Sequence, residues 1–477
     1  MGPLVAPALH ALEAKRSTSI LPLPALLAEQ IAAARRVARA VGVDVVDLAA
    51  HSDVFGYQAD ERRILASNTK LLTTAAALGE LGPDFEFQTR FLMRGDVGDD
   101  GALAGDLAIV AGADPNLSGR FHDGDAFAPF RPWAQALAAR GIRRVRGDLL
   151  LVNGLFDLPR VHPEWPDDQL TSWYEAPVDA LAFNDDCVLV RIEPGRAAGS
   201  AARVSTVPTM KYFEVRNAAR TVAEGRGRLT VGRLKDSDTL VVTGSINARS
   251  GPVDVWVAVH DPEAYFAAAV RAAFAEEGIR IDGADRFVHG PVEPGWQEIA
   301  VHASGLADTI RVTNKRSQNF YAETLAKYLG WKSFGHGTWE NAVAAISGFL
   351  VELGLEPEQF RLVDGSGLSR SDQATPRAIT ELLDKMYFRP YGREYLQSLP
   401  YSGEEGLAWR RRLATPPYRG NVFAKTGTLN GVSALSGYAK ASSGKVYAFS
   451  ILFNQVRSNA SAHDAQDRIV RALVDRG

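Results

Sequence analysis

Helix-like sequence at both ends of the chain encloses a long middle of short strands, and this arrangement limits the possible folds more than any other feature. A helical spacing of apolar residues covers 26–42 and returns from 308 to 389, whereas apolar runs broken by glycine and aspartate fill the region between. Three predicted strands and an amphipathic helix over 463–477 end the chain. With 477 residues, two or three domains are expected. The sequence therefore predicts one α/β (α+β) domain that is split by an insertion.

Composition narrows the class of ligand. Hydrophobic residues make up 46% and charged residues 23% of the chain, as in ordinary soluble globular proteins. A net charge of −3 and a pI near 6.3 give no basic surface for nucleic acid, so we expect no nucleic-acid partner. A small molecule, or a polymer held by local contacts, is the expected ligand.

Cysteine usage and the N-terminus bear on the compartment. The single cysteine, Cys187, excludes an intrachain disulfide and a cysteine metal cluster, and we expect it to point into the core from a strand. One cysteine suits either the cytoplasm or a bacterial periplasm. We expect no transmembrane segment, since no apolar run is long enough, and no convincing signal peptide, since residues 1–30 lack a basic stretch followed by an uninterrupted apolar run.

A serine precedes a lysine by three residues in the segment 62–81, RRILASNTKLLTTAAALGEL, which is predicted to form a buried helix. Two structural explanations exist: Ser67 could cap this helix, and Lys70 could extend to water from its first turn. The same spacing occurs at Ser442 and Lys445, in a Ser/Gly sequence that predicts a hairpin turn. The spacing alone is therefore a weak indication of chemistry.

Catalysis would explain both residues together. A serine hydroxyl becomes a good nucleophile when a base takes its proton, and a lysine can be that base when burial or a second cation keeps its amine neutral. Positions i and i+3 share one face of a helix, so Lys70 can reach Ser67. Free N–H groups at the helix N-terminus would also favour a developing oxyanion beside Ser67.

A second polar motif, Ser317 and Asn319, precedes a helix that we expect to begin near Tyr321. Both residues could simply cap that helix. The same Ser-x-Asn pattern at Ser245 and Asn247 lies in the β-rich middle and introduces no helix, so it is set aside.

A third motif, Lys425, Thr426 and Gly427, lies on a predicted strand near the C-terminus. Lys425 could be a solvated lysine on an edge strand. As part of a site, it would lower the pKa of Lys70 and attract a substrate carboxylate, and Gly427 would let a substrate strand approach the backbone. Three motifs in this order, each on the expected kind of element, together favour a catalytic site.

The three motifs, SNTK at 67–70, SQN at 317–319 and KTG at 425–427, resemble the SxxK, SxN and KTG motifs of penicillin-recognising serine peptidases. The long separation of the first two is similar to that in low-molecular-mass class C penicillin-binding proteins, the D-alanyl-D-alanine carboxypeptidase/endopeptidase family. DGSGLSR at 364–370 is also similar, and the resemblance covers nearly the whole chain. Gln318 departs from the commoner aspartate, and the missing secretion signal departs further because the family's substrate lies outside the cytoplasmic membrane.

The resemblance implies a β-lactamase/transpeptidase-like domain with an antiparallel sheet flanked by helices, split by two nested β-rich inserted domains. The implied boundaries are 1–88 with 298–477 for the catalytic domain, 89–168 with 255–297 for the second domain, and 169–254 for the third. Peptidoglycan stem peptides or cross-links would be the substrates and β-lactam antibiotics the inhibitors. No cofactor or metal is implied, and the location would be periplasmic or otherwise extracytoplasmic.

The resemblance also implies roles for individual residues. Ser67 would attack the D-Ala-D-Ala carbonyl to form an acyl-enzyme that water hydrolyses. Lys70 would be its general base, and Ser317 would pass a proton to the leaving D-alanine amine. Backbone N–H groups of Ser67 and Thr428 would form the oxyanion hole. The implied substrate-binding residues are Asn319 for the peptide amide, and Lys425, Thr426, Gly427 and Thr428 at the strand that takes the terminal carboxylate.

Two other functions stay open. A serine β-lactamase or related esterase shares the first motif, although such esterases and class C β-lactamases usually carry Tyr-x-Asn where this chain has Ser317. A non-catalytic peptidoglycan-binding scaffold could keep the fold, but it would not need Ser67, Lys70 and Ser317 together. None of the nine histidines lies in an HExxH pattern, so a zinc peptidase is not expected.

Overall fold

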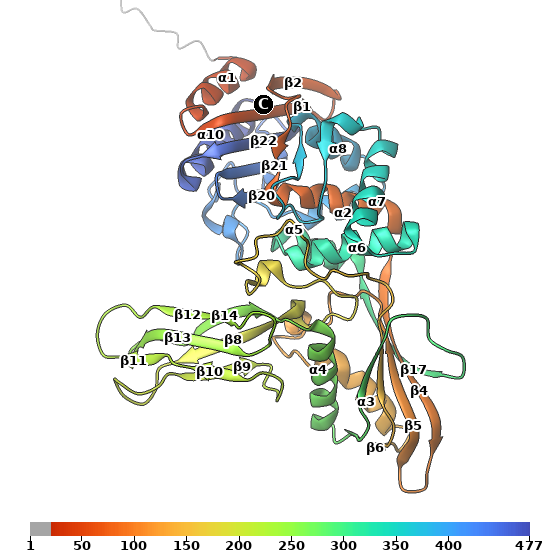
Figure 1. Cartoon of the computed structure of the whole chain (residues 1–477). Helices are drawn as coiled ribbons and strands as arrows, with labels where there is room; N and C mark the ends of the chain where they lie inside the picture. Colours follow the sequence, from red (N-terminus) through yellow and green to blue (C-terminus); the bar gives the residue numbers. More distant parts are fainter. Residues whose placement is uncertain (1–20) are drawn as a thin grey trace, which may run out of the picture.

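The structure, a computed structural model, describes residues 21–477, so most of the segment in which we expect no signal peptide lies outside the described residues. Figure 1 shows an upper body, where the described chain begins and ends, a lower body, and an arm of short strands. Along residues 21–477 no helix combines the length and the apolar character needed to cross a membrane.

The upper body is built on an antiparallel sheet in the order β2-β1-β22-β21-β20. Its strands come from both ends of the chain: β1 (Ala38–Asp47), β2 (Ser52–Tyr57), β20 (Val422–Leu429), β21 (Val432–Lys440) and β22 (Val446–Val456). The turn between β21 and β22 holds Ser442 and Lys445, so the second Ser-x-x-Lys pair lies in a hairpin turn, as predicted.

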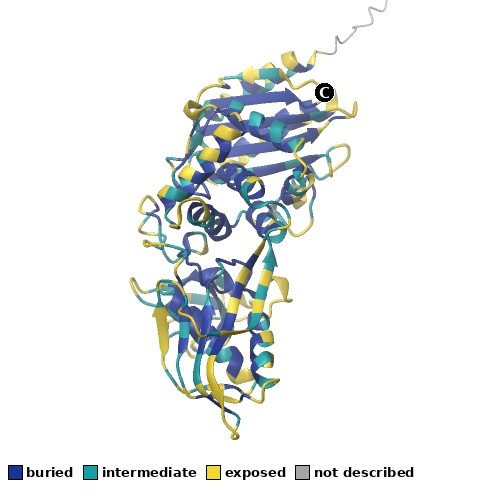
Figure 2. Ribbon diagram, turned by 90° about the vertical axis from the view of Figure 1, so that its right-hand side faces the viewer, coloured by how far each residue is buried: buried dark blue, intermediate teal, exposed yellow. Residues whose placement is uncertain are grey.

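Helices cover both faces of this sheet, which Figure 2 shows buried along most of its length. The core of one face is shared with α1 (Leu23–Ala34) and α10 (Asn459–Arg476). The core of the other face is shared with α2 (Thr69–Leu81), α5 (Leu306–Lys315), α6 (Asn319–Phe334), α7 (Trp339–Glu352), α8 (Pro376–Tyr387) and α9 (Gly392–Ser398). Three short strands, β3 (Arg63–Ile64), β18 (Phe360–Arg361) and β19 (Gln373–Ala374), form a small sheet of their own. The antiparallel sheet flanked by helices is the predicted fold class.

A second, mixed sheet forms the lower body, with its central strands in the order β15-β6-β5-β4-β17. Its strands are β4 (Glu86–Val97), β5 (Ala102–Val110), β6 (Arg144–Val145), β7 (Leu149–Val152), β15 (Arg280–Ile281), β16 (Asp285–Val288) and β17 (Gln297–Gly305). The helices α3 (Arg131–Ala138) and α4 (Pro262–Glu276) bury its core. The paired strands β4 and β17 extend toward the upper body (Figure 1), and the predicted boundaries at 88 and 298 fall within them. The three-domain division stays a prediction.

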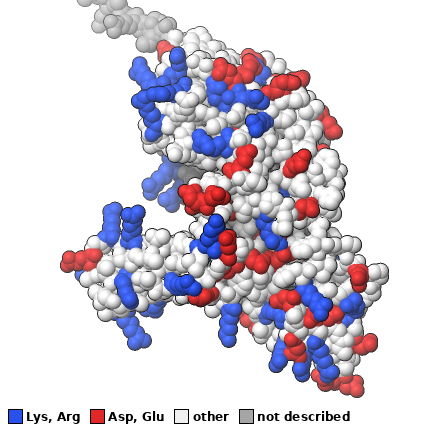
Figure 3. Space-filling view, viewed as in Figure 1, with Lys and Arg blue, Asp and Glu red and all other residues white. Residues whose placement is uncertain are grey.

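Short strands form the arm, in two small sheets with a common core. They are β8 (Cys187–Glu193), β9 (Arg203–Val207), β10 (Val215–Asn217), β11 (Arg220–Val222), β12 (Leu229–Arg233), β13 (Leu240–Asn247) and β14 (Val253–Ala258). Cys187 is buried at the start of β8, as predicted. Figure 3 shows basic and acidic side chains interspersed over the arm and both bodies on the face in view.

Short 3-10 turns connect several of these elements, and two of them carry residues of the site. They are η1 (Ala66–Asn68), η2 (Gly119–Phe121), η3 (Ala128–Phe130), η4 (Trp173–Glu175), η5 (Asn184–Asp186), η6 (Pro357–Gln359) and η7 (Ala408–Arg411).

The predicted helix over 26–42 is too long. α1 ends at Ala34, and β1 begins at Ala38, which pairs with Val456 of β22. Sheet pairing and burial of β1 outweigh the helical spacing of residues 38–42, because tertiary contacts override local propensity.

Candidate active site

Ser67 lies in the turn η1, immediately before α2. Its neighbour Ala66 has φ of 47°, a left-handed conformation that costs about 1 kcal/mol for a residue with a side chain and turns the chain sharply there. The first turn of α2 has no side-chain cap: the N-cap residue is Asn68, and its amide donates to the carbonyl oxygen of Lys425 instead. Ser67 is half-buried, and its hydroxyl faces a lysine rather than capping the helix.

Lys70 is fully buried and joins two of the predicted motifs. Its Nζ donates to Ser67 Oγ at 3.0 Å, to Asn319 Oδ1 at 2.6 Å and to the carbonyl oxygen of Ser366 at 2.8 Å. All three donor positions of the ammonium are thereby occupied, which fixes the amine beside the Ser67 hydroxyl. Lys70 does not extend to water, so the structural explanation for its position does not hold.

Burial lowers the pKa of Lys70 from 10.5 to about 7. The carboxylates of Asp364, Glu323 and Asp372 act in the opposite direction. Burial, and then the charge of Lys70, hold the pKa of Lys425 well below its usual range. The sequence predicts that the charge of Lys425 lowers the pKa of Lys70. Burial is the main cause of the shift at both lysines, and the two buried amines repel one another.

Ser317 lies between α5 and α6 and also faces an amine. Lys425 Nζ donates to Ser317 Oγ and to the carbonyl oxygen of Thr426, each at 2.8 Å. Ser317 has φ of 56°, again left-handed. The helix expected to begin near Tyr321 begins two residues earlier, at Asn319. Asn319 contacts Lys70 through Oδ1 and donates from Nδ2 to the carbonyl oxygen of Tyr174 at 2.9 Å.

The strand β20 places the third motif beside the nucleophile. Lys425 and Gly427 are buried, Thr426 is half-buried and Thr428 is exposed. A Cβ added to Gly427 would lie 2.6 Å from the carbonyl oxygen of Leu65 and 3.1 Å from the backbone nitrogen of Ser67. The missing side chain thus makes room for the turn that carries Ser67, a role in addition to the predicted approach of a substrate strand.

A cavity of about 440 Å³ opens over these groups. Four of the predicted residues line it: Ser67, Ser317, Asn319 and Thr428. Trp173 and Tyr174 of η4 form another part of its wall. The three motifs therefore meet at one open site, and part of that site comes from the β-rich middle of the chain.

The segment DGSGLSR, residues 364–370, is singled out in the sequence only because it resembles the same family. It packs against the turn that carries Ser67, and we call it the floor of the site. The carboxylate of Asp364 accepts from the backbone N–H groups of Ser366, Gly367 and Ser369 at 3.0, 2.6 and 2.7 Å. Gly367 has φ of 81°, and a Cβ there would lie 1.9 Å from the carbonyl oxygen of Ala66. The hydrogen bonds to Asp364 fix the position of the Ser366 carbonyl oxygen, which accepts a hydrogen bond from Lys70.

Sequence reasoning missed Glu323 on α6. Its buried carboxylate accepts from Trp339 Nε1 at 2.8 Å and from the backbone N–H groups of Gly365 and Ser366 at 3.0 and 2.8 Å. Burial, and next the charge of Asp364, raise the pKa of Glu323 to about 7. A carboxylate four residues after Asn319 on the same helix face was the available signal.

Comparisons with known proteins agree with this arrangement. Residues 24–475 match the family described as the D-Ala-D-Ala carboxypeptidase 3 (S13) family. A D-alanyl-D-alanine carboxypeptidase of Actinomadura sp. (strain R39) is 34% identical over 450 residues, covering 91% of this chain and 81% of that protein. Penicillin binding protein 4 of Haemophilus influenzae has a similar fold, with a TM-score of 0.78 and 23% identity over 94% of this chain and 98% of that one. Its complex with a β-lactam has a TM-score of 0.74 and 21% identity over 94% and 99% of the chains.

Proposed function

Because this chain belongs to the D-Ala-D-Ala carboxypeptidase 3 (S13) family, we propose that it is a serine carboxypeptidase with Ser67 as nucleophile. The family predicted from the three motifs is thereby confirmed, as is the expected class of enzyme. One observation carries the assignment of the nucleophile: the buried amine of Lys70 lies 3.0 Å from Ser67 Oγ. A lysine with a pKa of about 7 is partly neutral at neutral pH and can take the hydroxyl proton.

In the proposed acylation step, Ser67 Oγ attacks the carbonyl carbon of the D-Ala-D-Ala peptide bond while its proton passes to Lys70. The backbone N–H groups of Ser67 and Thr428 stabilise the oxyanion. Ser317, held by Lys425, then delivers a proton to the nitrogen of the departing D-alanine as the C–N bond breaks, and the proton that Lys70 took from Ser67 replaces it, so that Lys70 is neutral again. Water attacks the resulting ester, releases the shortened peptide and restores Ser67.

Substrate binding is proposed for polar side chains that line the cavity or lie next to it on β20. Thr426 and Thr428 lie beside Lys425, where the hydroxyls suit the terminal carboxylate of the peptide and a bound carboxylate favours the protonated form of the amine. Asn319 already accepts from Lys70 through Oδ1, and a carbonyl oxygen can accept a second hydrogen bond. A substrate amide N–H can therefore share this oxygen.

We propose peptidoglycan stem peptides or cross-links as the substrates and β-lactams as inhibitors, with an extracytoplasmic location to match. The carboxypeptidase name of the Actinomadura relative and the β-lactam bound to the Haemophilus protein support these assignments. Fractionated cells test the location: detection of the protein in the cytoplasm alone contradicts it.

Incubation with benzylpenicillin is expected to increase the intact mass of the wild-type protein by one penicillin, and the Ser67→Ala variant is expected to show no increase. The reason is that a β-lactam amide presents an acyl group to the same nucleophile. The wild type is also expected to release D-alanine from a peptide ending in D-Ala-D-Ala. Rapid loss of penicillin without an adduct favours a β-lactamase, whereas intact penicillin without an adduct favours an esterase or a scaffold.

The rate constant for acylation is expected to rise about tenfold between pH 6 and pH 8, because Lys70, with a pKa of about 7, is mostly protonated at the lower pH. Burial lowers this pKa, so the base becomes available at neutral rather than strongly alkaline pH. Acylation by a chromogenic β-lactam at constant ionic strength measures the profile. A rate that is unchanged from pH 6 to pH 8 rules out Lys70 as the titrating base.

A further inference from the structure

We propose that Asp185, in the β-rich middle of the chain, is a positioning residue that holds Gln318 and thereby keeps Ser317 and Asn319 in their working geometry. This inference rests on the proposed function, because it concerns the rate at which Ser67 is acylated. The proposal gives a structural role to Gln318, the middle residue of the SQN motif, which takes no part in the proposed mechanism.

The contact itself is short and buried. Gln318 is 6% exposed, and its Nε2 donates to Asp185 Oδ2 at 2.7 Å. Gln318 is also the N-cap residue of α6 and follows Ser317 directly. Its side chain therefore ties the start of this helix, where both neighbouring residues belong to the site, to η5 at the base of the arm.

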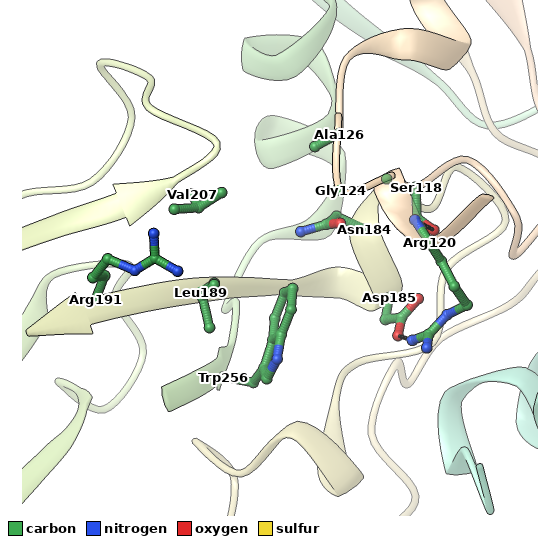
Figure 4. A pocket seen from close by; sticks show the side chains of 11 residues that line it. Ser118, Arg120, Gly124, Ala126, Asn184, Asp185, Leu189, Arg191, Val207 and Trp256 are labelled. Carbon is green, nitrogen blue, oxygen red and sulfur yellow. Dashed lines mark hydrogen bonds and ion pairs between the residues drawn. The ribbon is translucent and has the colours of Figure 1, made fainter. Parts of the chain in front are cut away.

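Asp185 is itself held in place from a third segment. Arg120 lies in η2, and its guanidinium donates to Asp185 Oδ2, so this oxygen accepts from both Arg120 and Gln318. Figure 4 shows Arg120 and Asp185 facing one another at the edge of a cavity of about 360 Å³. Asn184, Asp185 and Asp186 all have left-handed φ, of 54°, 62° and 48°. A turn with three left-handed residues is strained, so it persists only where neighbouring contacts stabilise it. The ion pair between Asp185 and Arg120 is one of these contacts.

The second motif needs this support because its own backbone is strained. Ser317 has a left-handed φ of 56°, which costs about 1 kcal/mol and favours relaxation if the neighbouring contacts are lost. Asn319 is held from the same β-rich region, through the carbonyl oxygen of Tyr174. The two residues that follow Ser317, whose hydroxyl must stay 2.8 Å from Lys425 Nζ, are thus anchored outside the catalytic sheet.

The hydrogen bond between Gln318 and Asp185 has a fixed donor and a fixed acceptor. Asp185 offers a carboxylate, which accepts, and Gln318 offers an amide N–H, which donates. A second carboxylate at position 318 would have the same length as glutamine but would repel Asp185. Exchanging donor and acceptor between the two positions would restore the hydrogen bond with its direction reversed and keep the net charge, and the new carboxylate at position 318 would take over the charge that faces Arg120.

The test is this exchange, measured as the rate constant for acylation by benzylpenicillin. Gln318→Glu is expected to lower the rate constant about tenfold or more, because the hydrogen bond is replaced by repulsion between two carboxylates. Asp185→Asn is expected to lower it about threefold to tenfold, because the hydrogen bond from Gln318 becomes a neutral one and the ion pair with Arg120 is lost. The double variant, Gln318→Glu with Asp185→Asn, is expected to return to within about threefold of wild type. Asp254→Asn is the matched control: Asp254 pairs with Arg191 at 2.8 and 2.7 Å on the exposed side of the arm, and its loss is expected to leave the rate constant unchanged.

A second readout does not depend on acylation. Backbone amide hydrogens of residues 316–320 are expected to exchange faster in Gln318→Glu and to regain wild-type exchange in the double variant. The proposal is overturned if Gln318→Glu matches wild type in both measurements, or if the double variant is no better than the worse single variant. A wild-type protein that fails to react with penicillin contradicts the proposed function instead, and the exchange measurement still decides the positioning role.

Discussion

Replacing Lys70 with methionine is expected to lower the rate constant for acylation of Ser67 by about a thousandfold or more, within the range typical of a lost general base. Methionine fits this fully buried position because it is unbranched and uncharged. The three hydrogen bonds of the ammonium disappear, and Ser67 loses the group that takes its proton. Intact-mass measurements at fixed times after adding benzylpenicillin give the rate constant.

The chain contains a matched control in its second Ser-x-x-Lys pair. Lys445 lies in the turn between β21 and β22, its side chain is 56% exposed, and it contacts Asp47 at 3.0 Å. Lys445→Met is expected to leave the rate constant within about twofold, because exposed ion pairs contribute little. If Lys70→Met keeps more than about a tenth of the wild-type rate constant, another group must be the base.

Replacing Gly367 with alanine is expected to lower the free energy of unfolding by about 3 kcal/mol, combining a left-handed φ with a steric overlap. The added Cβ would lie 1.9 Å from the carbonyl oxygen of Ala66, so either the floor or the turn η1 must move. Because η1 carries Ser67, acylation is expected to slow as well. Urea unfolding gives the free energy, and the penicillin reaction gives the rate.

Gly251→Ala serves as the control for this change. Nothing lies within 4 Å of a Cβ added at Gly251, and its φ is outside the left-handed region, so its stability is expected to change by less than about 1 kcal/mol. A Gly367→Ala protein as stable as the Gly251→Ala protein would show that the floor adapts without strain.

Local patterns predicted much of the fold and singled out the residues that the structure brings together at the candidate site. The strands that end the chain follow from alternating apolar residues, and α10 follows from its amphipathic spacing. Spacing could suggest that Lys70 reaches Ser67, since both residues lie within one turn. The resemblance predicted that the second and third motifs share a site with the first. In the structure, Asn319 of the second motif contacts Lys70, and Lys425 of the third motif contacts Ser317.

The supporting contacts could not be predicted in this way, because they join segments far apart in the chain. Asn319 donates a hydrogen bond to the backbone carbonyl oxygen of Tyr174. Because every residue has such an oxygen, no sequence pattern could identify this one as the partner. Likewise, the close approach of Leu65 to Gly427 depends on how η1 meets β20 in space. Local periodicity contains no information on either distance.

The order of strands in the central sheet has a consequence for synthesis on the ribosome. β1 lies between β2 and β22, so one edge of an apolar strand made at the start has no partner until the last strand of the chain emerges. At about 5–20 residues per second, the wait from Asp47 to Val446 is roughly 20–80 s. The lower body and the arm, whose strands pair within the stretch between, can close earlier. Until β22 is available, the N-terminal hairpin presents an open edge on which other chains can pair.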